Sequence, residues 1–387
     1  MNIAILGFGV VGKGAYETIC NSDCGLTVKR ILDLRVPQGM ENVVTTDIND
    51  ILNDESIEAV AEAIGGLHPA YEFVTRAIDA GKHVVSANKH LICHYYRELH
   101  ERAQAKGVEL RFTPAVGGGI PWLHNLRRVT RCDRILSLSG IMNGTTNYIL
   151  DSMLTRGIDF ADALREAQSL GYAEADPTAD IDGLDVRRKC AISASLAFGA
   201  VVTEEDVPTF GIRHITGEDV RRFEAMGFVC KLMAFAEERD GNITACVEPY
   251  LLPKDATEGS VNKNLNCITL IGERVGRLSF IGQGAGKDPT GMALAEDLVD
   301  VATGNAKLPV SLHDAVIDGS IRPHNYYVRT SAAMPNEVIL HRLQQAVITH
   351  PMTPEAIHSL YRELTDKDPH TFIAGLSAKD ASEAQLR

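Results

Sequence analysis

The chain has 387 residues, which predicts two or three domains, and its 45% hydrophobic and 23% charged content excludes a largely disordered or collagen-like protein. Its formal net charge of −13 argues against a nucleic acid as partner, because phosphate binding requires a basic face. The sequence has no apolar stretch long enough for a bilayer, and its start lacks the basic region of a signal peptide, so we expect neither a membrane partner nor a targeting segment.

The first 113 residues alternate between short apolar runs and longer helical patterns. The strand-like runs are residues 3–6, 27–34, 57–64, 83–86 and 108–112. Glu58 and Glu62 weaken the prediction for the third of these runs. Helical patterns end near residue 20 and cover 69–80 and 94–106. Strands that alternate with helices of about 10–15 residues predict βαβ units and a parallel sheet.

The pattern changes to an α+β arrangement after residue 134. Strands are predicted over residues 135–141, 245–251, 267–272 and 278–281. Helices are predicted over residues 145–155, 160–170, 183–198, 218–238 and 290–302. From residue 311 onward the signal thins, with a strand predicted over 326–330 and a helix over 336–347.

A glycine-rich turn of the form G-x-G-x-x-G directly follows the first predicted strand and opens a helix. Its residues are Gly7, Phe8, Gly9, Val10, Val11 and Gly12. The glycines allow a tight turn, close approach of the backbone to a pyrophosphate, and close packing of helix on strand. The helix N-terminus offers N–H groups to the phosphates. A glycine-rich turn without a ligand is the alternative, but this context predicts a Rossmann-type dinucleotide-binding domain.

Two charged residues near the end of the second predicted strand bear on the choice of nucleotide. Asp33 lies about 20 residues after Gly12, where a carboxylate accepts hydrogen bonds from the ribose and favours NAD. Arg35 is two residues further and favours the 2′-phosphate of NADP instead. The expectation leans to NAD, with a charged residue that merely ends a strand as the alternative.

The 8 cysteines are scattered and form no C-x-x-C pair. This spacing is a poor disulfide framework and a poor zinc site. We therefore expect free thiols and a cytoplasmic protein.

Three further segments are much more specific. Residues 86–89 read SANK, residues 140–150 read GIMNGTTNYIL, and residues 171–189 read GYAEADPTADIDGLDVRRK. With these segments the chain resembles homoserine dehydrogenase, in the form without an aspartokinase domain, from residue 1 to about residue 305. Residues 282–286, GQGAG, and the helix after them resemble that family's return to the cofactor domain.

The resemblance implies a reaction: the reversible NAD(P)H-dependent reduction of L-aspartate 4-semialdehyde to L-homoserine, in threonine and methionine biosynthesis. It also implies a homodimer or higher homo-oligomer, formed through the middle domain, where residues 245–281 are candidates for the contact. Two alternatives stay open. One is another NAD(P)-dependent oxidoreductase of amino-acid aldehydes, and the other is a cofactor-binding sensor without catalysis.

The expected fold class is α/β, with an N-terminal Rossmann-type doubly wound parallel sheet and an α+β domain for substrate binding and dimerisation. The expected domains are residues 1–125, to which the helix at 290–304 returns, residues 126–289, and a C-terminal extension over 305–387. That extension is read as a partial or degenerate ACT-like segment. Because the ligand-turn pattern expected after residues 326–330 is absent from the sequence, feedback by threonine is doubtful.

Two lysines and one aspartate, Lys189, Lys89 and Asp185, are the candidate catalytic residues. Asp185 and Lys189 are four residues apart in a predicted helix and therefore project from one face. Without the resemblance, such a pair is most often a surface ion pair. The resemblance implies that Lys189 donates the proton in the reducing direction and that Asp185 helps to place the substrate. It implies that Lys89, at a strand end, contacts the cofactor or the substrate oxygen.

The resemblance also assigns residues to the substrate and to the cofactor. Glu174 is implied to bind the substrate's amino group, and Asp180 to line the site. Gly144, Thr145 and Tyr172 complete the substrate set. Gly284 and Gly286 are added to the cofactor set of the glycine turn, Asp33, Arg35 and Lys89.

One segment departs from the family pattern. In several members a carboxylate and three backbone carbonyls hold a monovalent cation, which implies the carbonyls of Val116, Gly118 and Ile120 as sodium ligands here. Thr113 stands where the acidic ligand usually is, so a ligand set without charge is expected to hold sodium less securely. A loop that only turns the chain between domains is the alternative.

Overall fold

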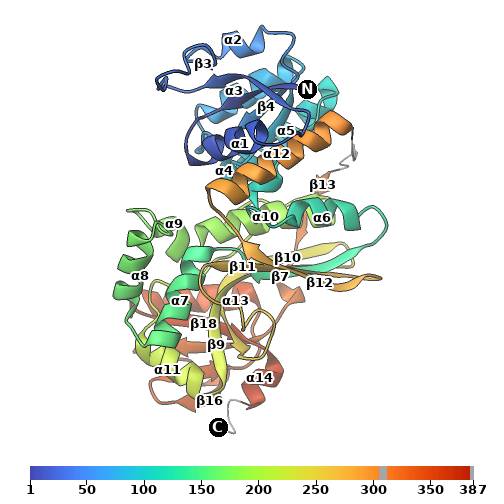
Figure 1. Ribbon diagram of the computed structural model, residues 1–387. Coiled ribbons are helices and arrows are strands. Elements are labelled where there is room, and N and C mark those ends of the chain that lie inside the picture. Colours follow the sequence, from blue (N-terminus) through green and yellow to red (C-terminus); the bar gives the residue numbers. More distant parts are fainter. Residues whose placement is uncertain (305–311, 384–387) are drawn as a thin grey trace. The chain divides into compact units, whose positions relative to one another are not determined.

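The computed structural model describes residues 1–304 and 312–383 (Figure 1), so residues 305–311 and 384–387 of the predicted C-terminal extension lie outside the described residues. The chain divides into two compact units. Unit 1 comprises residues 1–132, 195–203 and 282–314, and unit 2 comprises residues 133–194, 204–281 and 315–387. In the described part of the chain, no helix is both long and apolar enough to cross a membrane.

Unit 1 contains a parallel sheet in the order β3-β2-β1-β4-β5-β6, six strands within the described residues. Its strands are β1 (Asn2–Leu6), β2 (Thr27–Leu32), β3 (Val44–Thr45), β4 (Ala59–Glu62), β5 (His83–Ser86) and β6 (Leu110–Arg111). Its helices are α1 (Val10–Cys20), α2 (Asn49–Leu52), α3 (Ala70–Asp79), α4 (Lys89–His94), α5 (Tyr96–Lys106), α6 (Trp122–Val129) and α12 (Lys287–Thr303). A short pair, β8 (Ala200–Val201) with β13 (His313–Asp314), completes the unit. The prediction of a doubly wound parallel sheet is confirmed, and its strand order is that of dinucleotide-binding folds.

Helix α12 joins unit 1 from a distant part of the sequence and lies beside α1 (Figure 1). Glycines allow this close approach: a Cβ on Gly14 would lie 2.2 Å from the Lys287 carbonyl oxygen, and one on Gly291 would lie 2.4 Å from the Gly14 carbonyl carbon. Leu294 and Leu298 of α12 are completely buried against Ile3 of β1 and its neighbours. The helix predicted over 290–302 is therefore confirmed.

Unit 2 is built on a mixed sheet in the order β12-β11-β7-β9-β10-β18-β15-β17-β16, with β14 paired to β10. The strands that lie wholly or mostly in it are β7 (Ile135–Ile141), β9 (Phe228–Arg239), β10 (Asn242–Pro253), β11 (Leu265–Gly272), β12 (Gly276–Gln283), β14 (Val316–Ile317), β15 (Asn325–Arg329), β16 (Ile339–Leu343), β17 (Ala346–Thr349) and β18 (Phe372–Leu376). The helices are α7 (Gly144–Arg156), α8 (Phe160–Ser169), α9 (Thr178–Ile181), α10 (Leu184–Phe198), α11 (Gly217–Ala225), α13 (Pro354–Thr365) and α14 (Ala378–Glu383).

The single helix predicted over residues 218–238 is wrong. Helix α11 ends at Ala225, and Gly227, with φ +86°, turns the chain into strand β9. Strand β9 pairs with β10 over its whole length, from Phe228 opposite Pro253 to Arg239 opposite Asn242. Residues 228–236 are all buried, so the strand has no polar face and lacks the alternation that identifies strands in a sequence.

The helix predicted over residues 336–347 is also wrong. This stretch forms the hairpin β16–β17, whose turn includes Gln345 with φ +60°. Strands β15 to β18 are adjacent and antiparallel, and their spatial order in the sheet is β18-β15-β17-β16. If the four strands are numbered along the chain, this order is 4-1-3-2. This is the strand order of a βαββαβ unit, with the loop at 330–338 in place of the first helix.

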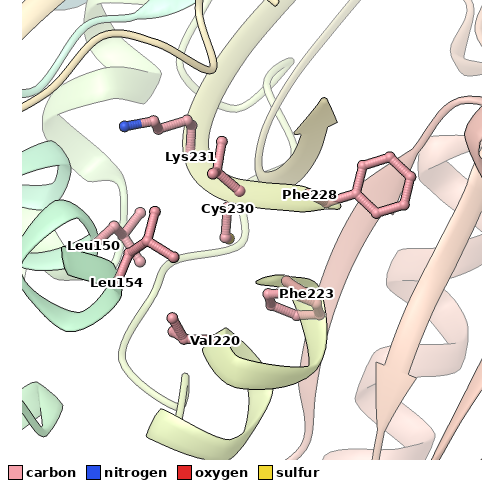
Figure 2. Close-up of a pocket in the computed structure, with 8 residues that line it drawn as sticks. Leu150, Leu154, Val220, Phe223, Phe228, Cys230 and Lys231 are labelled. Carbon is pink, nitrogen blue, oxygen red and sulfur yellow. The ribbon is translucent and has the colours of Figure 1, made fainter. Parts of the chain in front are cut away.

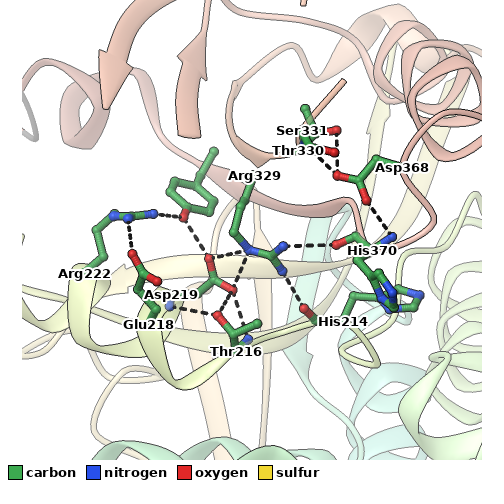
Figure 3. A network of polar contacts seen from close by, with 11 residues as sticks. His214, Thr216, Glu218, Asp219, Arg222, Arg329, Thr330, Ser331, Asp368 and His370 are labelled. Atoms are coloured by element: carbon green, nitrogen blue, oxygen red, sulfur yellow. Dashed lines mark hydrogen bonds and ion pairs between the residues drawn. The ribbon is translucent and has the colours of Figure 1, made fainter. Parts of the chain in front are cut away.

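A buried polar network attaches strand β15 to the rest of unit 2 (Figure 3). The Arg329 guanidinium lies 2.9 Å from the Asp219 carboxylate, which also accepts the Tyr327 hydroxyl at 2.8 Å. Arg329 further donates to the backbone carbonyls of His214 at 2.6 Å and His370 at 3.1 Å. The C-terminal strands are thus an integral part of the unit 2 sheet.

Candidate active site

The glycine turn joins β1 to α1 and leaves the N-terminus of α1 without a side-chain cap. Gly7 has φ +94°, and a Cβ on Gly12 would lie only 2.0 Å from the Gly7 carbonyl oxygen. Gly9 is the N-cap, and no atom lies within 4 Å of the position of its missing Cβ. The turn is therefore closed on the protein side and open on the other, which fits a pyrophosphate bound by backbone N–H groups.

The remaining residues of the motif surround this turn. Phe8 packs edge-to-face on Tyr16, with ring centroids 5.6 Å apart. Val11 is half-buried, and Val10 is 67% exposed although it is large and apolar. An exposed valine beside an open glycine backbone is compatible with a ligand that covers it.

Asp33 lies directly at the glycine turn. One carboxylate oxygen accepts the Phe8 N–H at 2.7 Å, and the other accepts the Arg35 N–H at 3.0 Å. Each oxygen keeps a further lone pair, so the carboxylate still has acceptors for ribose hydroxyls. The Arg35 side chain is exposed. The structure thus brings Asp33 together with the motif, as a support for its backbone.

Lys89 is the first residue of α4, three residues after the end of β5, and its side chain is half-buried. Asn88 caps this helix by accepting the Leu91 N–H at 3.1 Å. Ser86 at the end of β5 donates its hydroxyl to Glu62 at 2.5 Å. Glu62 is completely buried. Sequence reasoning missed Glu62, because a carboxylate in an apolar run only weakened the strand prediction, and its burial leaves no mark in the sequence.

The predicted residues of the two glycine-rich loops also meet within unit 1. Gly118 has φ +54°, and a Cβ there would lie 2.7 Å from the Gly284 carbonyl carbon. Gly286, with φ +127°, is the N-cap of α12. The close backbone contact with Gly284 explains why glycine occurs at position 118.

The predicted cation ligands lie in the same buried loop. Thr113 donates both its N–H and its hydroxyl to the Asp297 carboxylate, at 2.9 and 2.8 Å. The Ile120 carbonyl accepts the Trp122 N–H at 2.7 Å. Burial raises the pKa of Asp297, and Arg127 opposes that shift. The carbonyl and hydroxyl oxygens of this loop are of the kind that hard cations prefer, but the predicted ligands include no carboxylate. Over the described ranges, no cluster of three or more His, Cys, Asp or Glu residues could hold a metal ion.

In unit 2, Asp185 and Lys189 form a buried ion pair on α10. The Lys189 Nζ lies 2.8 Å from the Asp185 carboxylate and donates to the Met142 carbonyl at 2.7 Å. Only 8% of the Lys189 side chain and 7% of the Asp185 side chain are exposed. The pair is therefore not the surface ion pair that spacing alone suggests.

Asn143 connects this pair to a second predicted carboxylate. Its amide group donates to Asp180 at 2.7 Å and to Asp185 at 2.9 Å, while its oxygen accepts the Thr146 N–H at 2.8 Å and caps α7. Asp180, Asp185 and Lys189 are thus brought together. Sequence reasoning missed Asn143, although an asparagine directly before a helix is a recognisable N-cap signal.

The other predicted substrate residues lie at the same end of α7 and in the loop before α9. The Thr145 hydroxyl donates to the Tyr172 carbonyl at 2.6 Å. A Cβ on Gly144 would lie 2.6 Å from the Asn264 carbonyl oxygen. Tyr172 is 40% exposed and Glu174 is exposed, with its backbone carbonyl held by Gln168 at 3.1 Å. The Glu174 carboxylate is therefore available to a charged ligand.

A small pocket in unit 2 lies elsewhere (Figure 2). It is lined by Leu150, Leu154, Val220, Phe223, Phe228, Val229, Cys230 and Lys231. The Lys231 ammonium donates to the Asn147 amide oxygen at 2.9 Å and to the Val261 carbonyl at 2.6 Å. Burial lowers the pKa of Lys231 to about 8. No predicted site residue lines this pocket, and we assign it no part in the site.

The open glycine turn of unit 1, at the end of a parallel strand, has the geometry of a dinucleotide-binding domain. Unit 2 separately holds a buried lysine–carboxylate cluster. Both features are typical of the class of nicotinamide-nucleotide-dependent oxidoreductases.

Comparison with known proteins identifies the family. Residues 7–113 match the description "Homoserine dehydrogenase, NAD binding domain", and residues 121–299 match "Homoserine dehydrogenase". The chain is 39% identical to a homoserine dehydrogenase of Synechocystis sp. over 78% of this chain and 73% of the relative. It is 36% identical to that of Pseudomonas aeruginosa over 86% and 82%. A crystal structure of a homoserine dehydrogenase from Thiobacillus denitrificans superposes with a TM-score of 0.87, at 33% identity, over 97% of this chain and 98% of that one.

The chain belongs to the homoserine dehydrogenase family. It is therefore an NAD(P)-dependent oxidoreductase, and the expectation raised by its signature segments is confirmed. Neither another amino-acid-aldehyde oxidoreductase nor a sensor without catalysis finds support in these comparisons.

Proposed function

We propose that Lys189 is the proton donor when L-aspartate 4-semialdehyde is reduced to L-homoserine. When bound, the nicotinamide nucleotide supplies a hydride to the aldehyde carbon. The aldehyde oxygen then gains negative charge, and the Lys189 ammonium gives it a proton. Asp185 holds the ammonium in place, and Asn143 holds Asp185. The observation that carries this role is the buried Lys189–Asp185 pair at 2.8 Å.

The remaining predicted residues of unit 2 bind the substrate in this proposal. The exposed Glu174 carboxylate receives the substrate ammonium, and Asp180 adds negative charge to the same site. Gly144 and Thr145, at the N-terminus of α7, offer backbone N–H groups to the substrate carboxylate. Tyr172 covers the site from the loop that carries Glu174.

In unit 1 we propose that the glycine turn, Asp33, Lys89, Gly284 and Gly286 bind the nucleotide, with NADH preferred over NADPH. The match of residues 7–113 to the family's NAD-binding domain supports the nucleotide site, but it does not bear on the preference for NADH. The preference rests on Asp33, whose carboxylate at the turn accepts ribose hydroxyls and repels a 2′-phosphate. Arg35 is the opposing group, and its exposed side chain reaches into solvent.

For the cation we propose a weak site made of the Val116, Gly118 and Ile120 carbonyls. The Thr113 hydroxyl, which donates to Asp297, leaves only neutral oxygens for such an ion. Exchange of sodium chloride for choline chloride at constant ionic strength tests this site. Equal activity in both salts would remove the cation from the proposal.

We further propose a cytoplasmic homodimer that associates through unit 2. The edge strand β12 and the turn before it carry exposed apolar side chains, among them Val275 at 45% and Ile281 at 53%. We also propose that the C-terminal extension over 305–387 is a partial or degenerate ACT-like segment, whose described strands β15–β18 belong to the unit 2 sheet. Light scattering tests the dimer, and a monomer at micromolar concentration would contradict it.

The decisive experiment on the mechanism is Lys189→Ala. Loss of a general acid lowers kcat by about 10²–10⁴, while the affinity for NADH stays unchanged. The matched control is Lys82→Met, because Lys82 is also a buried lysine that donates to two backbone carbonyls, of Asp54 and Ile57. A kcat of Lys189→Ala within threefold of wild type would remove Lys189 from the mechanism.

A further inference from the structure

We propose that Glu62 is a positioning residue for the cofactor, because its buried carboxylate fixes both loops that follow the central strands β4 and β5 of unit 1. The inference rests on the proposed placement of the nucleotide at the glycine turn. It adds a residue that neither the signature segments nor the glycine motif identifies.

The position of Glu62 in the sheet is the first argument. The strand order β3-β2-β1-β4-β5-β6 reverses direction between β1 and β4, and in such sheets the ligand binds at the carboxyl ends of the strands beside that point. Glu62 is the last residue of β4, paired with Leu6 of β1 on one side and with Ser86 of β5 on the other. A completely buried carboxylate therefore lies at the base of the expected cofactor crevice.

The donors around the carboxylate are the second argument. One oxygen accepts the Ile64 N–H at 2.8 Å and the Gly65 N–H at 3.3 Å. The other accepts the Ser86 hydroxyl at 2.5 Å, and the Asn88 amide lies 3.5 Å from the first oxygen. Burial raises the pKa of Glu62, and all of these donors oppose that shift. An acceptor-only, ionised carboxylate satisfies this set of donors, whereas a neutral amide would turn a donor towards donors.

The loops that Glu62 holds touch the predicted cofactor residues. Ile64 is directly against the glycine turn, since a Cβ on Gly7 would lie 3.0 Å from the Ile64 nitrogen. On the other side, the Ser86 hydroxyl accepts the Asn88 N–H at 3.0 Å, and Asn88 caps α4 directly before Lys89. Loss of the carboxylate therefore loosens both the turn that receives the pyrophosphate and the start of the helix that carries Lys89.

The test compares Glu62→Gln with Glu58→Gln, which lies on the same strand run but is exposed and accepts only the Asn2 N–H at 3.2 Å. Dissociation constants for NADH and NADPH are measured by fluorescence titration, together with the KM for aspartate semialdehyde and the Tm. We expect Glu62→Gln to weaken both nucleotides about tenfold, since charged hydrogen bonds of this kind are lost. The KM of Glu62→Gln for the semialdehyde should stay within twofold of wild type. The dissociation constants and the KM of Glu58→Gln should also stay within twofold, and its Tm should be unchanged.

A second variant keeps the proposal testable if Glu62→Gln does not fold. Ser86→Ala removes one donor and the bridge to Asn88, and we expect it to weaken nucleotide binding in the same direction but less. A lower Tm with unchanged nucleotide affinity, in whichever variant folds, would make Glu62 purely structural and overturn the proposal. Gly9→Ala serves as reference: if it also binds nucleotide normally, the proposed cofactor site itself is wrong, and not only the role of Glu62.

Discussion

The two units provide for their ligands in opposite ways. In unit 1 the groups assigned to the nucleotide are mainly backbone N–H groups, and the carboxylates of Asp33 and Glu62 hold that backbone in place. In unit 2 the assigned groups are charged side chains, with Asp185 and Lys189 held by Asn143 and by the Met142 carbonyl. From this difference we expect substitutions to act mainly through backbone shape in unit 1 and through charge in unit 2.

The largest effect in unit 1 is expected from its glycines. Gly12→Ala places a Cβ 2.0 Å from the Gly7 carbonyl oxygen, so α1 cannot start as it does and unit 1 should lose its fold. Gly9→Ala meets no atom within 4 Å, so the fold should persist while the pyrophosphate is blocked. Circular dichroism and NADH titration of both variants separate these outcomes.

The contrast between the two glycines also shows how the prediction can fail. If Gly12→Ala folds and binds NADH as wild type does, backbone shape does not govern unit 1. If Gly9→Ala keeps full affinity, the open side of the turn does not face the nucleotide. Either result would break the comparison at its first step.

Acid provides a second test, in which the two units should behave alike. Burial lowers the pKa of His100 in unit 1 to about 4, and that of His358 in unit 2 to about 4 as well. The unfolded chain takes up these protons near pH 6.5, so it binds more protons than the folded chain between about pH 6.5 and 4. Stability is therefore lost as the pH falls through this window, by about 2 kcal/mol for His100 at pH 5.

The variants for this test are His100→Phe and His358→Phe. His100 already packs between the rings of Tyr96 and Phe112, at 4.4 and 5.5 Å, and His358 stacks on Phe210 at 3.8 Å, so an added ring has partners in each case. In each variant, the urea midpoint should decrease less between pH 7 and pH 5 than it does in the wild type. If only one does, a single unit limits the acid stability of the whole chain.

The sequence predicted most of the parallel sheet of unit 1, because its strands alternate with helices and the glycine motif marks the first turn. It missed the two-residue strand β3 and the short helices α2 and α6, which are too short to show a periodic pattern. In unit 2 the same reasoning failed at residues 228–236, where a strand buried on both faces has the composition of a buried helix. Only the pairing of β9 with β10, which is a tertiary interaction, decides between the two.

The candidate site divides in the same manner. Lys189 and Asp185 were proposed as site residues because they lie in a long signature segment. Their i,i+4 spacing alone would have indicated a surface ion pair. Asn143 and Glu62 were missed, because their hydrogen bonds reach residues distant in the sequence, Asp185 and Ser86 among them. The N-cap position of Asn143 could be read from the sequence, but its bond to Asp185 and the burial of Glu62 could not.

The smallest expected effect concerns the choice of nucleotide, where shape and charge compete at a single residue. Asp33 supports the Phe8 N–H and also repels a 2′-phosphate, so its loss has two consequences. Asp33→Asn keeps an acceptor oxygen for the Phe8 N–H but removes the charge and the acceptor for the Arg35 N–H, whereas Asp33→Ser removes the whole carboxylate. We expect both variants to shift the ratio of kcat/KM for NADH and NADPH towards NADPH by about tenfold, or about 1.4 kcal/mol.

The serine variant should in addition lose affinity for NADH, because the Phe8 N–H then lacks its partner at the turn. Arg35→Ala is the opposing test: if Arg35 governs the choice, the wild type favours NADPH and this variant loses NADPH more than NADH. A wild type that strongly favours NADPH and an Asp33→Asn variant with an unchanged ratio would show that the carboxylate acts only on the backbone. The backbone shape of unit 1, and not the charge of Asp33, would then govern nucleotide binding. The contrast with the charged side chains of unit 2 would be larger than proposed.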